Sequence, residues 1–457
     1  MKRKNGCTGL LALLVASSLL TVALSEEGYG CFLSLETPTP EGNEWFGYNV
    51  NICGDVVLSS EPYGDLDEEI DAGKVYLYDI EGSLVSILVS PNPDSDNKFG
   101  ISSDIYEDKI IVGESADIGE LEWAGLAHIF DSEGNLLKTL QAPNPEAGEH
   151  YGASGVAIGR DRILVSEHGK DLEVGLSGRV HMYDLQGNYM KTLTSPSPKV
   201  RGYFGSSLKV GDDIILIGEI GHYGSDKVIG GSVYVYDLDG NHLMTLQAPE
   251  PEEHACYGVS ISTSEDKIVV GECYATVNDA WRAGRAYLYN ENGELLHTYV
   301  APVPEQNARF GYDVAISGET VVIGEWNADV EAAMNEGKTY IFDTDGNLLA
   351  TITAPEPCPR AAFGFAVDVE GDTIVVGECW ATVNGNSNSG KIHFYGKGAE
   401  PATPESEESP IETVAEETTE DRAEGIPGFP VEALSLGVIC IVVFYGLMQR
   451  KRSSPFF

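Results

Sequence analysis

An aromatic–glycine pair recurs seven times along the chain, at spacings of 53, 52, 53, 53, 53 and 53 residues. The seven pairs begin at Phe46, Phe99, Tyr151, Phe204, Tyr257, Phe310 and Phe363. A second marker, Pro-x-Pro, keeps the same period in every copy, from Pro38 and Pro40 to Pro355 and Pro357. Two independent markers in one register indicate a repeat architecture, in which each copy is one supersecondary unit that stacks on its neighbours.

Each copy has the pattern of four β-strands. In the sixth copy, residues 310–316 alternate in polarity, residues 320–323 form a short apolar run, and residues 338–342 alternate again. Residues 348–352 complete the set, and residues 343–347 form a tight turn before them, in which glycine supplies a positive φ. Four strands in about 50 residues are typical of a propeller blade, so the sequence predicts an all-β, seven-bladed β-propeller over residues 26–399.

The ends of the repeat array predict how the ring closes. The seventh copy stops at residues 391–395 and lacks its fourth strand. A strand-like segment from Cys31 to Leu35 precedes the first Pro-x-Pro, as the fourth strand does in the other copies. We therefore expect the N-terminal strand to complete the last blade, which would protect both sheet edges.

The repeat resembles the FG-GAP repeat of integrin α-chain propellers and microbial surface proteins. The resemblance rests on Phe-Gly, Gly-Asp between the first two strands and Gly-x-x-Tyr at the third strand, and it covers residues 31 to about 396. It implies a non-catalytic surface protein that binds a ligand or mediates adhesion. The family's Asp-x-Asp-x-Asp-Gly calcium loop is absent, and Gly-Glu or Ser-Glu replaces its Gly-Ala-Pro element, so the resemblance implies no calcium site here.

The first 25 residues predict a cleavable export signal. Basic residues at positions 2–4 precede an apolar run over 10–24, and the small residues Ala23 and Ser25 stand before Glu26. An uncleaved anchor helix is the alternative. We take Glu26 as the mature start and therefore expect the body of the protein to lie outside the cytoplasm.

The C-terminus predicts a tether. Residues 400–425 are rich in Thr, Ser, Pro and Glu without apolar periodicity, which is typical of a disordered acidic stalk. Residues 426–457 hold an apolar stretch followed by basic residues, the pattern of a membrane anchor with a cytoplasmic tail. Pro427-Gly428-Phe429 near its start, followed by the apolar stretch and the basic end, resembles an archaeal sorting signal, although Glu432 departs from that pattern. We thus expect a single C-terminal anchor on the extracellular face of the cell membrane.

The charge narrows the range of partners. With 72 acidic and 28 basic residues the formal net charge is -44, and this field repels phosphate backbones, so we expect no nucleic-acid partner. An extracellular protein or a glycan is the partner class that fits, and the propeller is expected to be monomeric.

One glutamate ends the second strand of every copy. The seven are Glu61, Glu114, Glu167, Glu219, Glu272, Glu325 and Glu378. We expect each to accept N–H bonds from the adjacent Pro-x-Pro loop, and a set of seven local cation sites, with calcium as the ion, is the alternative. The Asp-x-x-Gly corners at Asp79, Asp131, Asp184, Asp237 and Asp343 are interpreted as hairpin turns rather than as calcium loops.

All five tryptophans fall in the long loops of one propeller face. They are Trp45, Trp123, Trp281, Trp326 and Trp380, and Tyr274 lies with them. Tryptophan is enriched in binding centres, so these residues are the candidate ligand-binding face, with packing between blades as the alternative.

Cysteine positions on the same face predict two disulfides in an exported protein, Cys256–Cys273 and Cys358–Cys379. Cys31 and Cys53 are left unpaired. No catalytic motif is present in the sequence, and we expect neither enzymatic activity nor a cofactor. One alternative is a carbohydrate-active enzyme with active-site residues dispersed over the same face, and carboxylates gathered on the propeller axis would favour it. The other alternative is a structural component of the cell envelope.

Overall fold

The computed structural model describes residues 28–168, 178–198, 202–220, 230–331 and 333–399. All of them belong to one compact unit of the chain, Met1–Thr403. The predicted export signal (1–25), stalk (400–425) and anchor (426–457) lie outside the described residues, and these remain predictions. Within the described part there is no helix that is long and apolar enough to cross a bilayer.

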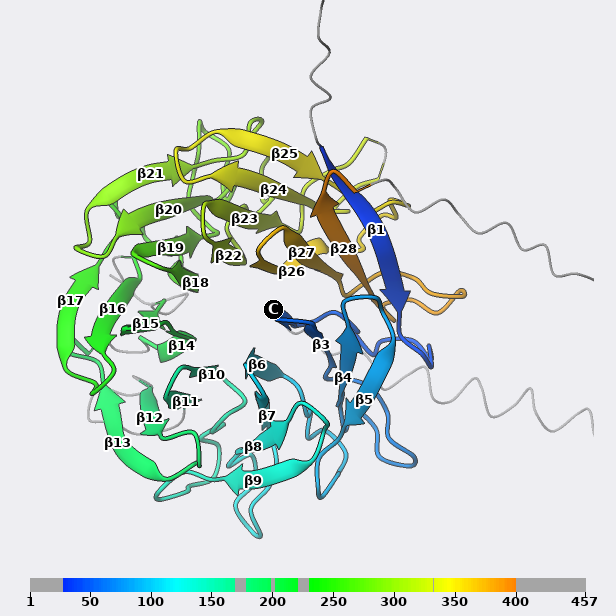
Figure 1. The fold of residues 1–457 in the computed structure, drawn as a ribbon, viewed down its shortest axis with the longest axis vertical. Helices are drawn as coiled ribbons and strands as arrows, with labels where there is room; N and C mark the ends of the chain where they lie inside the picture. The colour runs from blue at the N-terminus through cyan, green and yellow to red at the C-terminus, as the bar shows by residue number, and fades with distance from the viewer. Residues whose placement is uncertain (1–27, 169–177, 199–201, 221–229, 332, 400–457) are drawn as a thin grey trace, which may run out of the picture. The chain divides into compact units, whose positions relative to one another are not determined.

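Seven antiparallel sheets of four strands each surround a central axis (Figure 1). The innermost strands are β2 (Val50–Cys53), β6 (Ser102–Tyr106), β10 (Val156–Gly159), β14 (Phe204–Val210), β18 (Tyr257–Ser264), β22 (Val314–Ser317) and β26 (Phe363–Glu370). The second strands are β3 (Val56–Glu61), β7 (Lys109–Glu114), β11 (Arg162–Glu167), β15 (Ile214–Glu219), β19 (Lys267–Glu272), β23 (Thr320–Glu325) and β27 (Thr373–Glu378). The third strands are β4 (Lys74–Asp79), β8 (Leu126–Asp131), β12 (Arg179–Tyr183), β16 (Ser232–Asp237), β20 (Arg285–Asn290), β24 (Lys338–Asp343) and β28 (Lys391–Lys397). The outermost strands are β5 (Leu84–Leu88), β9 (Leu136–Leu140), β13 (Tyr189–Thr194), β17 (His242–Leu246), β21 (Leu295–Tyr299), β25 (Leu348–Ile352) and β1 (Tyr29–Glu36). The predicted all-β, seven-bladed propeller is confirmed.

The N-terminal strand closes the ring as predicted. β1 pairs antiparallel with β28, with Cys31 opposite Tyr395 and Leu35 opposite Ile392. The last sheet therefore has the strand order β1-β28-β27-β26 and joins the two ends of the array. A further bond at this seam runs from the Phe46 N–H to the Ser389 carbonyl at 2.9 Å.

The aromatic–glycine pair joins each blade to the one before it. The seven aromatic side chains are fully buried in the apolar layers between blades. In the sixth copy, the Phe310 N–H donates to the Ala283 carbonyl of the preceding blade at 2.8 Å. Gly311 follows with φ 77°, and a Cβ there would lie 2.5 Å from the Arg285 carbonyl oxygen, so only glycine fits. In this copy β22 begins at Val314, four residues after the predicted start at residue 310.

The hydrophobic core is divided into layers, each shared by two neighbouring blades. The layer between the fifth and sixth blades contains Val269, Leu288, Phe310, Ile323 and Tyr340. The layer at the seam contains residues of β2–β4 together with residues of β26–β28, and β1 packs against it. The ring is therefore held together by burial between blades as well as by the β1–β28 ladder.

Candidate functional site

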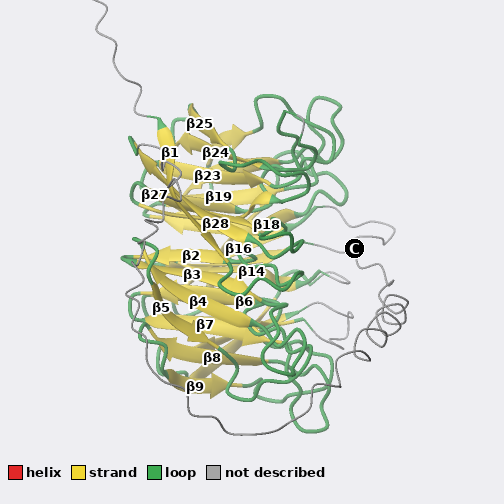
Figure 2. Cartoon of the chain, turned by 90° about the vertical axis from the view of Figure 1, so that its right-hand side faces the viewer, coloured by secondary structure: helices red, strands yellow, loops and turns green. Residues whose placement is uncertain are grey.

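The two faces of the propeller differ in the length of their loops. Long loops project from one side of the strands and short turns from the other (Figure 2). The long loops connect the second to the third strand within a blade, and the fourth strand to the first strand of the next blade. We call this side the loop face.

Neighbouring loops of the loop face are hydrogen-bonded to each other. The Asn307 N–H donates to the Trp281 carbonyl at 2.7 Å, and the Arg360 N–H donates to the Met334 carbonyl at 2.9 Å. At the seam the Asn43 N–H donates to the Ser387 carbonyl at 2.9 Å. These bonds join different blades, so this part of the surface is organised before any ligand arrives, which lowers the entropy cost of binding.

Three of the five tryptophans pack together where the seventh blade lies between the sixth and the first. The ring centroids of Trp326 and Trp380 are 5.1 Å apart, and those of Trp380 and Trp45 are 5.7 Å apart. Trp45 also contacts Tyr63, with centroids separated by 4.6 Å. Trp326 is only 6% exposed, so the centre of this group is recessed below the surface.

Two arginines extend the group toward the fifth blade. The Arg309 guanidinium lies 4.4 Å from the centroid of Trp326 and 5.4 Å from that of Tyr274. The Arg282 guanidinium lies 4.7 Å from Tyr274 and 4.0 Å from Trp281. Such separations place each cation within range of the negative faces of two aromatic rings.

On the other side a lysine continues the contacts into the second blade. Lys98 Nζ lies 5.8 Å from the Tyr63 centroid and 5.6 Å from the Trp123 centroid. Trp123 in turn meets His150 edge to face, with centroids 5.6 Å apart. We call the whole series the aromatic arc; in order it comprises Trp281, Arg282, Tyr274, Arg309, Trp326, Trp380, Trp45, Tyr63, Lys98, Trp123 and His150.

The aromatic arc contains all six aromatic residues of the predicted ligand-binding face. Trp281 and Trp123 near its two ends are 55% and 50% exposed, whereas Trp326 is buried. Both alternatives raised for the tryptophans therefore apply to different members: the central ones pack between blades, and the terminal ones are accessible. Reasoning from the sequence missed the three cations, because their ring contacts depend on how the long loops are placed. Arg309 and Lys98 each contact rings from two blades, and Arg282 contacts two rings of its own loop in the fifth blade.

The seven repeated glutamates are buried, and each accepts a hydrogen bond from the third strand of its own blade. The donors lie at 2.5–3.2 Å and are Tyr76, His128, His181, Tyr234, Tyr287, Tyr340 and His393. A Tyr or His stands 14 or 15 residues after every one of these glutamates, and this signal was available in the sequence.

The expected bonds from the Pro-x-Pro loops take a different form. Thr37 Oγ1 donates to Glu61 at 2.6 Å, and Ser195 Oγ donates to Glu219 at 2.8 Å. Both hydroxyls belong to the residue just before the first proline, so the donor is a side chain and not a backbone N–H. Proline itself has no N–H to offer, which accounts for the difference.

Burial dominates the acidity of several of these carboxyls. It raises the pKa of Glu61 to about 7 and that of Glu325 to about 8. Glu336, a buried carboxyl that is not one of the seven repeated glutamates, has its pKa raised to about 8 by burial and by the charge of Glu378. Among the described residues, no group of three or more His, Cys, Asp or Glu side chains is arranged to hold a metal ion.

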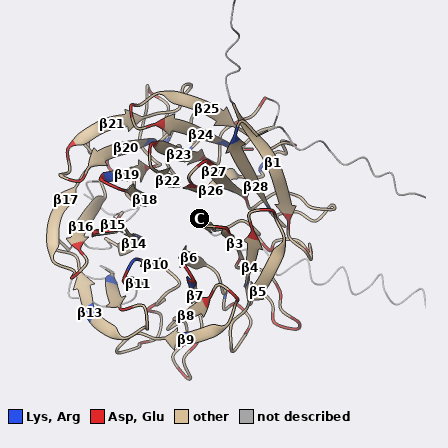
Figure 3. Cartoon of the chain, in the orientation of Figure 1, with Lys and Arg blue, Asp and Glu red and all other residues tan. Residues whose placement is uncertain are grey.

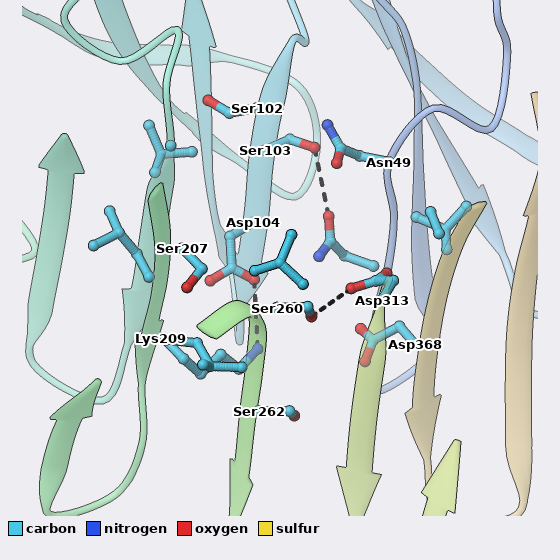
Figure 4. A pocket seen from close by; sticks show the side chains of 18 of the residues that line it. Asn49, Ser102, Ser103, Asp104, Ser207, Lys209, Ser260, Ser262, Asp313 and Asp368 are labelled. Atoms are coloured by element: carbon cyan, nitrogen blue, oxygen red, sulfur yellow. Dashed lines mark hydrogen bonds and ion pairs between the residues drawn. The ribbon is translucent and has the colours of Figure 1, made fainter. Parts of the chain in front are cut away.

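A cavity of about 400 Å³ lies within the ring of innermost strands, lined by serine and asparagine side chains together with apolar ones (Figure 4). Three carboxylates and one cation face it: Asp104, Asp313, Asp368 and Lys209. Lys209 Nζ is 3.9 Å from Asp104 Oδ1. The negative charge of Asp104 raises the pKa of Lys209, while burial raises the pKa of Asp368 to about 6.

These three carboxylates join adjacent blades. Asp104 Oδ2 accepts the Ile158 N–H at 2.9 Å, and Asp368 Oδ2 accepts the Ile52 N–H at 2.9 Å. Asp313 Oδ2 accepts the Val367 N–H at 2.8 Å, and its Oδ1 accepts a bond from Ser260 at 2.7 Å. Each carboxylate is thus fixed by backbone donors, a role that the sequence did not reveal.

The cysteines of the described residues are all free, so neither predicted disulfide is present in the structure. Tyr257 pairs with Glu272, which places Cys256 and Cys273 opposite each other one position further along. Phe363 pairs with Glu378, so Cys379 faces Ala362 and not Cys358. Cys358 lies four residues before Ala362 and bonds through its N–H to Glu336.

The Asp-x-x-Gly corners are hairpin turns, as interpreted. In each of the five, the aspartate Oδ1 accepts the N–H of the residue four positions ahead, at 2.6–2.8 Å. At Asp237 this bond and the Asn241 amide lower the pKa of the carboxyl. The carboxylate therefore serves its own turn.

Comparisons with known proteins agree with this fold. Two segments, residues 299–342 and 347–395, match the model of the FG-GAP repeat family. No curated protein matches the chain in sequence. The WD40 domain of Neurospora crassa Pan2 is similar in structure, with 11% identity and a TM-score of 0.52 over 83% of this chain and 98% of that one. A chain from the crystal structure of the mitotic checkpoint complex gives 12% identity and a TM-score of 0.49 over 86% of this chain and 99% of the other. The likeness to the Pan2 domain shows the fold alone.

Proposed function

We propose that this protein is a non-catalytic binding protein of the cell surface, which holds a glycan on the loop face along the aromatic arc. The observation that supports it is the contact series itself, which joins every tryptophan of the chain on one face. Aromatic rings offer flat apolar surfaces on which sugar rings stack, and the exposed Trp123 and Trp281 are accessible for that contact. The predicted stalk and anchor would tether the propeller to the membrane.

A carbohydrate-active enzyme is the second candidate, because Asp104, Asp313 and Asp368 do face one cavity. A catalytic carboxylate needs an oxygen that reaches the substrate, either as acid or as nucleophile. Here both oxygens of Asp368 accept backbone bonds, from Ile52 and from Val369 at 2.9 Å each. The same holds for Asp104, with the N–H groups of Ile105 and Ile158. This bonding favours a structural role for the cavity and supports the binding protein over the enzyme.

Tryptophan fluorescence offers a direct test, because all five tryptophans lie on the aromatic arc. We would titrate the purified protein with oligosaccharides of glucose, N-acetylglucosamine and galacturonic acid and record the emission. We expect a saturable change with at least one of them, and a weaker affinity in Trp281→Ala and Trp123→Ala.

The matched control is Leu137→Ala, which removes a 52% exposed apolar side chain from the outer strand β9. It should bind as the unaltered protein does. An affinity that both tryptophan variants leave unchanged would refute the proposal, and release of reducing sugar ends during the titration would favour the enzyme.

A further inference from the structure

Tyr274 lies between two guanidinium groups on the loop face. The Cζ atoms of Arg282 and Arg309 are 4.7 Å and 5.4 Å from the centroid of its ring. The two arginines are also linked through the backbone, since the Arg309 N–H donates to the Arg282 carbonyl at 3.2 Å. Two like charges are therefore held against one ring by the loop structure, at a cost in mutual repulsion.

No acidic side chain of the described residues forms an ion pair with Arg309, although the chain carries 72 acidic residues. Its Nε is buried without a hydrogen-bond partner. Two other arginines of the described residues are paired with two carboxylates each: Arg285 contacts Glu252 and Glu272, and Arg179 contacts Glu149 and Glu167. Acidic residues are spread over all the blades, with few basic residues among them (Figure 3). A buried, unpaired guanidinium donor in such a protein indicates that its anion comes from outside the chain.

We propose that Arg282, Tyr274 and Arg309 form a clamp for the carboxylate of an acidic sugar within a polysaccharide. This inference rests on the proposed function, because it assigns the ligand class of the same face. The guanidinium groups supply charge-assisted donors in a fixed fork, which suits a carboxylate. Trp281, which is 55% exposed and lies 4.0 Å from Arg282, takes an adjoining sugar ring, whereas the buried Trp326 packs against the Arg309 guanidinium at 4.4 Å.

The order of groups favours a polyuronide over an acidic peptide. Along the part of the arc that is not buried, rings and cations alternate as Trp281, Arg282, Tyr274 and Arg309. A polymer of uronic acids likewise alternates an apolar ring face with a carboxylate, whereas an acidic peptide offers carboxylates without ring faces. Burial and the charge of Arg309 lower the pKa of Arg282, and a bound carboxylate between them would relieve that repulsion.

The net charge of -44 gives this binding an unusual salt dependence. The repulsion between the whole protein and a polyanion acts over a long range, and the screening length falls from about 30 Å at 0.01 M salt to about 8 Å at 0.15 M. The clamp acts at contact and is half-buried, so it is screened less. Affinity for a polyuronide should therefore rise between these two salt concentrations, opposite to ordinary polyanion binding.

The test compares an oligogalacturonide with its fully methyl-esterified form, by tryptophan fluorescence at both salt concentrations. We expect the free acid to bind about tenfold or more tightly than the ester, and Arg309→Gln and Arg282→Gln to remove that preference. Arg360→Gln is the matched control, because Arg360 is an exposed arginine in a loop of the same face. Each variant is checked for an unchanged melting temperature, and Arg309→Lys serves as a second, conservative variant.

The outcomes separate the clamp from the proposed function. Equal binding of acid and ester, with both weakened by Trp281→Ala, would overturn the clamp and leave the proposed function standing. A response to neither sugar would count against both. Poly-glutamate that binds as tightly as the oligogalacturonide, with the same loss in Arg309→Gln, would overturn the glycan assignment in favour of an acidic peptide.

Discussion

Glu325 makes a pH-dependent contribution to stability that a single substitution removes. It ends β23, is fully buried and accepts a bond from the Tyr340 hydroxyl at 2.7 Å. Its Oε1 has no hydrogen-bond partner. The nearest cation, Lys338, is already bonded to Glu305 at 2.7 Å. Burial therefore dominates and raises the pKa of Glu325 from 4.5 to about 8.

The sign follows from proton binding in the two states. Below pH 4.5 the carboxyl is protonated in both the folded and the unfolded chain, and its contribution is fully present. Between pH 4.5 and about 8 only the folded chain keeps the proton, so the free energy of unfolding falls by up to ~1.4 kcal/mol per pH unit. The whole loss is on the order of 3–5 kcal/mol, and above pH 8 it stays constant. Glutamine cannot ionise, so Glu325→Gln abolishes this loss.

The assay is denaturant unfolding of the unaltered protein and of Glu325→Gln at pH 4.5, 6, 7.5 and 9. We expect similar stabilities at the lowest pH and a growing advantage of the variant as the pH rises. The control is Glu319→Gln, which removes the same charge from an exposed position in the same blade. If the difference between Glu325→Gln and the unaltered protein does not change with pH, the buried-carboxyl reasoning is refuted.

Three further predictions concern closure, ions and thiols. Deletion of residues 29–36 removes β1 and exposes the edge of β28, so we expect soluble oligomers by light scattering; a monomer with unchanged melting would contradict the latch. Because the repeated glutamates accept bonds from Tyr, His, Ser, Thr and Arg side chains, we expect calcium or a chelator to shift the melting temperature by less than ~2 °C; a larger shift would mean structural cation sites. Cys256 and Cys273 face each other across a strand pair, so peptide mapping of the exported, unreduced protein should find this disulfide, with Cys358 and Cys379 as free thiols; a Cys358–Cys379 bond would contradict the observed register.

The repeat predicted the blades and their closure because one interaction recurs at every blade boundary. Phe310 and Gly311 show how it works: the ring fills the inter-blade layer, and glycine allows the chain to touch the preceding blade. Because every blade boundary requires this contact, the aromatic–glycine pair occurs seven times in the sequence, and its period can be recognised from the sequence alone. The missing fourth strand of the last copy predicted β1 for the same reason.

The parts that escaped prediction are those without a common position in the repeat. Asp104 and Asp368 stand five residues after the aromatic residue of their copy, but Asp313 stands three residues after its own. No single position in the repeat therefore identifies the cavity carboxylates. Lys98 and Arg309 share the position directly before the aromatic residue, but Trp45, Tyr203, Cys256 and Ala362 occupy it in other copies, so the position does not identify a cation. Only the donors to the repeated glutamates could have been found, because a Tyr or His occupies that position in every copy.

The aromatic arc exists only in the closed ring, because it crosses the seam. Trp45 belongs to the first blade and Trp380 to the last, and their ring centroids are 5.7 Å apart. Residues 45–150 and 274–380, which supply the two halves of the arc, are joined across this boundary by β1 and by the bond from Phe46 to Ser389. A ligand that spans both halves binds the closed ring and not an opened one, so its binding free energy adds to the stability of the latch. The strand that completes the fold thus also completes the proposed binding face.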